Sequence, residues 1–168
     1  MKTGRIEIPL EVLDRIRLLP FGKNPHLDQQ KYEDSGYDID CLNRHEQYGT
    51  GDAIRDGLDW DWTDIFLPEG WKDVGLQFDR AYSGYCIPPH QDHYQFYRKR
   101  FNHSAKDIKR RLVFLEEWKS GHYFQVNASV FVQWRQGDWV EFEHRDIHLG
   151  GNLGPDVRYT LQITGVEY

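Results

Sequence analysis

The amino-acid sequence predicts a mainly β domain, built as a sandwich or barrel, with a few helices at its flanks. After Gly70 the chain breaks into short segments rich in β-branched and aromatic residues, separated by turn-forming residues. Strands in such quick succession favour two packed sheets or one sheet closed on itself. The length of 168 residues suits one domain with a substantial core, so residues 1–168 are expected to fold as a single unit.

The first elements are a helix and a long irregular segment. Apolar residues recur at helical spacing over Leu10–Leu19, between Pro9 and Pro20, which predicts a short helix. Residues 21–70 are expected to be irregular and to cover the barrel, with a helical turn near Asp52–Leu58. Strands are expected over Val74–Tyr85, Arg111–Trp118, Tyr123–Val126, Val130–Trp134, Trp139–Glu143 and Val157–Val166.

The last of these strands has two unlike faces. Side chains alternate across a strand, so Val157, Tyr159, Leu161 and Ile163 share one side. That side is expected to pack in the core. The other side is polar and would ordinarily meet solvent; it carries Arg158, Thr160, Gln162 and Thr164.

Composition excludes several classes of protein. The net charge of -6 disfavours non-specific binding to nucleic acid, and the basic runs 97–101 and 106–111 are interpreted as solvated surface. No apolar run is long enough to span a bilayer, and residues 1–10 lack the pattern of a secretion signal, so a cytoplasmic location is expected. Cys41 and Cys86 are far apart and form no C-x-x-C motif, which predicts buried thiols rather than a disulfide or zinc site.

Histidine and aspartate recur at a spacing suited to metal binding. On a strand, His and Asp two positions apart point to the same face. Two imidazoles and one carboxylate leave half of an iron's coordination positions open for a bidentate co-substrate and dioxygen. Three His-x-Asp pairs occur: His26/Asp28, His90/Asp92 and His144/Asp146.

Local context separates these pairs. The first lies in a loop containing proline and asparagine and is interpreted as a turn. The third is followed only by His148, too near for another strand to supply the third ligand, so His144 is interpreted as a neighbour of the site. The pair His90/Asp92 follows an expected strand and precedes the distant His148, and it is the preferred candidate.

The C-terminal half also resembles a known family. The segments Trp134–Phe142, Asp146–Gly154 and Arg158–Gln162 are similar to 2-oxoglutarate/Fe(II)-dependent oxygenases, particularly small single-domain members from bacteria and bacteriophages. The resemblance begins near Val74, and residues 1–70 match no family pattern. It implies a double-stranded β-helix, a jelly-roll or cupin-like barrel, with residues 71–168 as its core.

The resemblance also assigns roles. His90, Asp92 and His148 match the iron ligands, and Arg158 matches the residue that pairs with the distal carboxylate of 2-oxoglutarate. Thr160 would share its strand face and donate a further hydrogen bond. The tyrosines expected to contact the co-substrate or substrate are Tyr82 and Tyr94.

The activity implied is hydroxylation of a C–H bond using O2, with release of succinate and CO2 and with ascorbate as an auxiliary reductant. The substrate would be a small metabolite, an amino acid or a peptidyl side chain, in the cytoplasm of a bacterium or phage-infected cell. Two alternatives stay open: a cupin-like metalloenzyme that does not use 2-oxoglutarate, and a non-catalytic jelly-roll binding module. A protein partner for residues 21–70 also stays open, and the sequence does not specify the oligomeric state.

Overall fold

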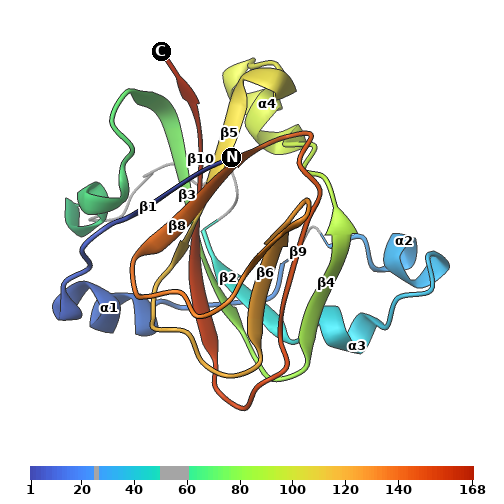
Figure 1. Ribbon diagram of the computed structural model, residues 1–168. Coiled ribbons are helices and arrows are strands. Elements are labelled where there is room, and N and C mark those ends of the chain that lie inside the picture. The colour runs from blue at the N-terminus through green and yellow to red at the C-terminus, as the bar shows by residue number, and fades with distance from the viewer. Residues whose placement is uncertain (25–26, 50–60) are drawn as a thin grey trace.

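The computed structural model describes residues 1–24, 27–49 and 61–168, and its strands form two antiparallel sheets that face each other (Figure 1). The larger sheet contains, in spatial order, β1 (Lys2–Arg5), β8 (Asp138–Glu143), β5 (Ile108–Phe114), β10 (Arg158–Glu167), β3 (Trp71–Ala81) and β2 (His45–Tyr48). The smaller sheet contains β4 (Tyr85–His90), β9 (His148–Asn152), β6 (His122–Val126) and β7 (Ser129–Phe131).

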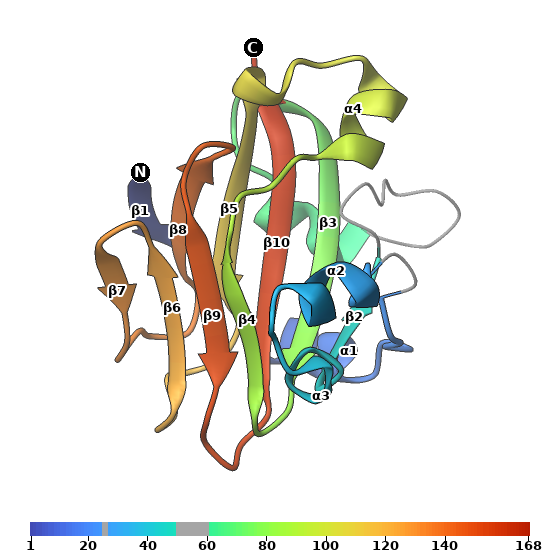
Figure 2. The ribbon, with the colours of Figure 1, turned by 90° about the vertical axis from the view of Figure 1, so that its right-hand side faces the viewer.

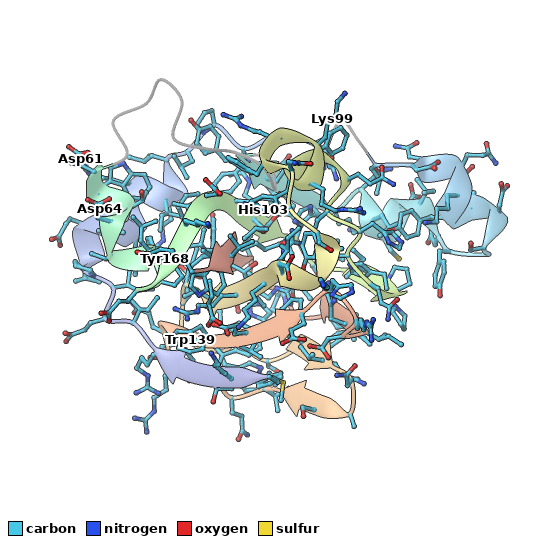
Figure 3. All side chains as sticks on the ribbon, turned by 90° about the horizontal axis from the view of Figure 1, so that it is seen from above. Asp61, Asp64, Lys99, His103, Trp139 and Tyr168 are labelled. Atoms are coloured by element: carbon cyan, nitrogen blue, oxygen red, sulfur yellow. The ribbon has the colours of Figure 1, made fainter. Side chains whose placement is uncertain are left out.

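The helical segments lie around these sheets. They are α1 (Leu10–Arg17), α2 (Gln29–Asp34), α3 (Ile39–Leu42), α4 (Gln95–Phe101) and the 3-10 turns η1 (Asp61–Phe66) and η2 (Ala105–Asp107). Figure 2 shows α2 and α3 beside β4, the edge strand of the smaller sheet. Figure 3, seen from above, places Asp61 and Asp64 of η1 on the opposite side of the molecule from these two helices. In the described residues, no helix has the length and apolar character needed to cross a membrane.

One apolar layer covers the outer face of the larger sheet. Leu161 and Ile163 of β10 pack there with Phe78 of β3. The layer is closed from outside by α1 and η1, whose buried side chains are Val12, Leu13, Ile16 and Phe66. The outer face of β10 is therefore core, as its alternation predicted.

A second apolar layer fills part of the space between the sheets. Phe114 of β5 stacks on Trp134 with ring centroids 3.9 Å apart, and Phe124 of β6 meets both Phe114 and Phe142 of β8. This cluster joins strands of both sheets at one end of the interior. The other end is left for polar side chains.

The predicted elements agree with the structure in part. The predicted first helix is confirmed as α1, and the predicted strand at 157–166 is confirmed as β10. The expected strand over 74–85 is two strands, β3 and β4, separated by a turn at Gly84, where φ is 85°. The strand β9 was not predicted, because adjacent glycines weaken the strand pattern.

The expectation for residues 21–70 is corrected where the structure describes them. This segment carries α2, α3 and η1, and its strand β2 pairs with β3 in the larger sheet. The helical turn expected near 52–58 lies outside the described residues. Because β1 and β2 both precede residue 71, the sheet is not confined to residues 71–168.

The two cysteines are closer in space than their sequence separation suggested. Cys41 lies in α3 and Cys86 in β4, and both are partly exposed free thiols rather than buried ones. Partial burial, and then a hydrogen bond with Cys86, raise the pKa of the Cys41 thiol. These cysteines therefore lie where the helical cap, formed by α2 and α3, meets β4 at the edge of the smaller sheet.

Gly137 begins the turn into β8 and is expected to be intolerant of substitution. Its φ is 81°, and a Cβ there would lie 1.9 Å from the carbonyl oxygen of Ile6. We expect Gly137→Ala to lower the free energy of unfolding by about 2–4 kcal/mol, through backbone strain and steric overlap. Denaturant unfolding of Gly137→Ala and of the control Gly22→Ala, whose new Cβ would meet nothing within 4 Å, measures this effect. Equal stability of the two variants would contradict it.

Candidate active site

The ends of two neighbouring strands bring together a His-Asp-His cluster. His90 ends β4 and His148 begins β9, and these residues lie opposite each other in the antiparallel pair. Asp92 lies two residues after the end of β4, and its carboxylate lies near both imidazoles. One ligand atom from each of the three residues lies within 4.8 Å of the others, so the cluster could hold a metal ion.

Backbone carbonyl groups orient both imidazoles. Nδ1 of His90 lies 2.9 Å from the carbonyl oxygen of Pro88, and Nδ1 of His148 lies 3.2 Å from that of Asp146. A carbonyl only accepts hydrogen bonds, so each Nδ1 carries the proton and donates it. Each Nε2 is then left with a free lone pair, which is the form that binds a metal. These Nε2 atoms lie 3.9 Å (His90) and 3.5 Å (His148) from the Asp92 carboxylate.

The carboxylate of Asp92 is bound by Arg110 of β5. Nη1 of Arg110 donates to Oδ2 of Asp92 at 2.8 Å, and its Nε donates to the hydroxyl of Thr164 at 3.3 Å. Burial opposes ionisation of Asp92, but Arg110 first and the two histidines next outweigh it and hold its pKa below the usual value. Asp92 is therefore a fixed anion with one oxygen bound to Arg110 and the other left for a cation.

His148 is neutral over the physiological range. Its side chain is buried, and this burial lowers its pKa from 6.5 to about 4, against the opposing effect of Asp92. The unfolded chain binds a proton near pH 6.5 and the folded chain only near pH 4. The metal-free protein therefore loses stability as the pH falls through this interval.

We expect the free energy of unfolding of the metal-free protein to fall by about 2–3 kcal/mol between about pH 7 and about pH 4.5 because of His148. Denaturant unfolding in the presence of a chelator, at both pH values, measures this loss. The variant His148→Gln lacks the titrating group and should lose correspondingly less. The same pH dependence in both proteins would contradict the assignment.

A cavity of about 1050 Å³ opens beside the cluster. Its wall on the larger sheet is the inner face of β10, where Arg158, Thr160 and Gln162 line it. The polar face of the last strand therefore faces a cavity rather than bulk solvent. Gly150 of β9 lies beside Arg158, since a Cβ there would be in ordinary contact with its Nη1 at 3.4 Å and in tight contact with the ring of Phe124 at 3.1 Å.

Arg158 is a buried cation with an unfilled donor. Its Nη1 donates to the carbonyl oxygens of Tyr123, at 2.7 Å, and Gly151, at 3.1 Å. Within the described residues its Nε is buried without a hydrogen-bond partner, and no carboxylate forms an ion pair with the guanidinium. Burial lowers the pKa of Arg158. A buried guanidinium in this state favours an anionic ligand, since two carbonyls and the more distant carboxylate of Asp79 compensate its charge only in part.

Solved structures show a matching architecture. The chain is similar over 99% of its length to a prolyl-4-hydroxylase from Pseudomonas putida, covering 92% of that chain with a TM-score of 0.60 and 13% identity. The fold is a double-stranded β-helix. At such identity the likeness concerns the fold alone.

Two cupin structures match with lower TM-scores. A sugar phosphate isomerase of the cupin superfamily from Silicibacter pomeroyi matches with a TM-score of 0.46 and 12% identity, over 74% of this chain and 61% of that one. The cupin domain of Cnp3 from Schizosaccharomyces pombe matches with a TM-score of 0.45 and 10% identity, over 75% and 63%. The chain thus spans less than two thirds of the length of these two structures. No family model and no curated protein sequence matches it.

Of the remaining residues singled out in the sequence, two line the cavity and one lies outside it. Thr160 and Tyr94 line the cavity; burial raises the pKa of the Tyr94 phenol, and its ring lies 4.9 Å from the guanidinium carbon of Arg110. Tyr82 does not line the cavity. Its hydroxyl donates at 2.9 Å to Glu46 of β2, the edge strand of the larger sheet. Arg158 and Thr160 therefore share the cavity with the His-Asp-His cluster, and Tyr82 lies outside it.

The third His-x-Asp pair is structural. The carboxylate of Asp146 accepts hydrogen bonds from Asn127 and from the backbone of Glu143, both at 2.8 Å, and so closes the turn before β9. His144 is half-buried and does not line the cavity. Its position near the cluster but outside it makes it a useful control.

Several cavity residues were missed by the sequence reasoning. Arg110 had been placed in a solvated basic run, but it is bound to Asp92. Asp79 and Gln77 of β3 and His45 of β2 also line the cavity. The alternation of β3 carried a signal for the first two, because Leu76 and Phe78 face the outer core and leave residues 77 and 79 on the inner face.

Proposed function

We propose that this protein is an Fe(II)- and 2-oxoglutarate-dependent oxygenase that hydroxylates a C–H bond of a small metabolite, amino acid or peptidyl side chain. The observation that carries the proposal is the shared cavity of the His-Asp-His cluster and the unfilled Arg158 guanidinium. The first suits a ferrous ion with open coordination positions, and the second suits a carboxylate. A prolyl-4-hydroxylase shares the fold.

The spacing of the two subsites fits a dicarboxylate. His148 and Gly150 lie two residues apart on β9, about 7 Å along a strand. Arg158 lies against Gly150, so its guanidinium is displaced from the cluster by about that length. A five-carbon 2-oxo diacid is long enough to reach from the metal to Arg158, whose guanidinium would pair with its distal carboxylate beside Thr160.

Charge balance also supports the pair of ligands. Among the described lining residues that are buried or half-buried, the cations Arg110 and Arg158 are matched by the anions Asp79 and Asp92, and the two other cations of the lining, Lys23 and Lys31, are exposed. Adding a divalent metal alone, or a dianion alone, would leave an uncompensated double charge in a poorly solvated space. Adding both leaves the net charge of the cavity unchanged, which favours their binding together.

Each protein group then has a limited task. His90, Asp92 and His148 would hold the iron, and Arg110 holds one carboxylate oxygen of Asp92 and leaves the other for the metal. Arg158 orients the co-substrate. The bound iron would supply the redox chemistry by which O2 oxidises 2-oxoglutarate to succinate and CO2 and hydroxylates the substrate. The cavity walls place the substrate and shield the centre from bulk water.

The test is conversion of 2-oxoglutarate by the purified protein. With Fe(II), ascorbate and O2, we expect slow formation of succinate without added substrate, and 2-oxoglutarate binding to the Mn(II)-loaded protein by calorimetry. Metal binding without any effect of 2-oxoglutarate would instead support a cupin-like metalloenzyme. Absence of metal binding would overturn both readings.

A further inference from the structure

A polar group on the inner face of β3 and β10 takes no part in the proposed chemistry. Asp79 is 3% exposed and lies opposite Thr160 in the strand pair. Its carboxylate accepts from Nε2 of Gln77 at 2.7 Å and from Nε2 of Gln162 at 3.0 Å. Nε2 of His45 lies 3.0 Å from the same carboxylate. All four residues line the cavity.

The carboxylate fixes the direction of both amides. An ionised carboxylate can only accept, so Gln77 and Gln162 must turn their NH2 groups toward Asp79. Their carbonyl oxygens then point away from it. In the described residues neither carbonyl oxygen accepts a hydrogen bond from a protein group, and neither is buried without a partner. Both remain open as acceptors in a residue that lines the cavity.

This acceptor wall, defined by Gln77, Asp79 and Gln162, is unsuited to the co-substrate. Two amide oxygens in front of a buried carboxylate repel a dicarboxylate, whereas Arg158 attracts it. The wall must therefore face another ligand that brings hydrogen-bond donors, because an acceptor desolvated without a donor destabilises the complex. A positively charged donor also gains from the carboxylate behind the amides.

We infer that the prime substrate of this site carries an ammonium or guanidinium group, bound by the acceptor wall while a nearby C–H bond is oxidised. The inference rests on the proposed function and specifies its substrate class. Tyr32 and Tyr37 line the same cavity from the helical cap, and aromatic faces also attract cations. The net charge of -6 attracts a cation over longer range. Two exposed lysines, Lys23 and Lys31, also line the cavity, and Lys23 is bonded to the carbonyl of Asn43 and lies 3.7 Å from Glu46.

The experiment compares cationic ligands with neutral counterparts of similar shape. Capped tripeptides acetyl-Ala-Xaa-Ala-amide, with Xaa as arginine or citrulline and as lysine or Nε-acetyl-lysine, are titrated into protein loaded with Mn(II) and 2-oxoglutarate. We expect each cationic peptide to bind about tenfold or more tightly than its neutral counterpart, the range for hydrogen bonds to a charged group. Free L-arginine and L-lysine, titrated in parallel, distinguish an amino acid from a peptidyl side chain as the source of the cation.

Variants localise the effect. Gln77→Met removes one acceptor without changing the charge and should reduce the preference for the cation to about threefold or less. The control Gln125→Met alters a glutamine of β6 whose amide donates to Asn127, outside the cavity, and should keep the full preference. Equal or tighter binding of the neutral peptides, best binding of a glutamate peptide, or no binding of any cationic ligand would overturn the inference. Failure of the proposed function is seen separately, as absence of 2-oxoglutarate binding in the loading step.

Discussion

His148→Ala is expected to lower the affinity for divalent metal by more than about a hundredfold and to abolish formation of succinate from 2-oxoglutarate. Loss of an outer-shell partner alone typically costs about 10–100-fold in metal affinity, so loss of a ligand should cost more. The imidazole is buried and neutral, and its Nε2 lies 3.5 Å from Asp92 within the three-residue cluster. Calorimetric titration with Mn(II) and an assay of succinate measure the two effects.

The matched control is His144→Ala. This substitution removes an imidazole four positions earlier that is half-buried and lies outside the cavity. Metal affinity and succinate formation should both stay close to those of the unaltered protein. A similar loss in both variants would show that the effect is a general disturbance of the turn before β9, and retention of tight metal binding by His148→Ala would refute the ligand assignment.

Arg158→Leu is expected to weaken 2-oxoglutarate binding by about a hundredfold or more while leaving Mn(II) binding nearly intact. Removing one partner of a buried, hydrogen-bonded ion pair costs about 3–5 kcal/mol, since the remaining charge has no counterion. Leucine fills much of the space without burying a charge, so the fold should survive. Titration of the Mn(II)-loaded variant with 2-oxoglutarate measures the change.

Arg158→Lys refines this result. Lysine keeps the positive charge but cannot donate through a planar fork, so its affinity should lie between those of the unaltered protein and Arg158→Leu. An unchanged affinity in Arg158→Leu would mean that the co-substrate is anchored elsewhere or not used. In that case metal-dependent turnover independent of 2-oxoglutarate would be the activity to seek.

Much of the fold could be predicted because its signals are local. The helical spacing before Pro20 specified α1, and strict alternation in 157–164 specified both faces of β10. The strand β9 carried no such signal, since its glycines satisfy the close approach of the rings of Phe124 and Tyr123 rather than a strand propensity. The helices α2 and α3 were missed because each spans few residues and lacks an extended apolar stripe.

In the candidate site, too, residues with a local sequence signal could be predicted, and residues placed by strand pairing could not. The spacing of His90 and Asp92 on one face is visible in sequence, and the structure joins them to His148 through the pairing of β4 and β9. The role of Arg110 depends on which strand lies beside which, and a basic run in sequence gives no indication that one of its members is turned inward. Tyr82 illustrates the opposite error, because a tyrosine at a strand end can turn to an edge carboxylate as readily as to a cavity.

The central strand β10 serves the hydrophobic core with one face and the cavity with the other. Leu161 and Ile163 are fully buried under α1, and Arg158 and Thr160 project from the reverse side. A substitution under the helix that shifts the strand would thus displace Arg158, the proposed anchor for the dicarboxylate, even though it touches no ligand. Laboratory evolution toward new substrates should therefore leave β10 untouched and diversify the cap of α2 and α3, which borders the cavity without supporting that strand.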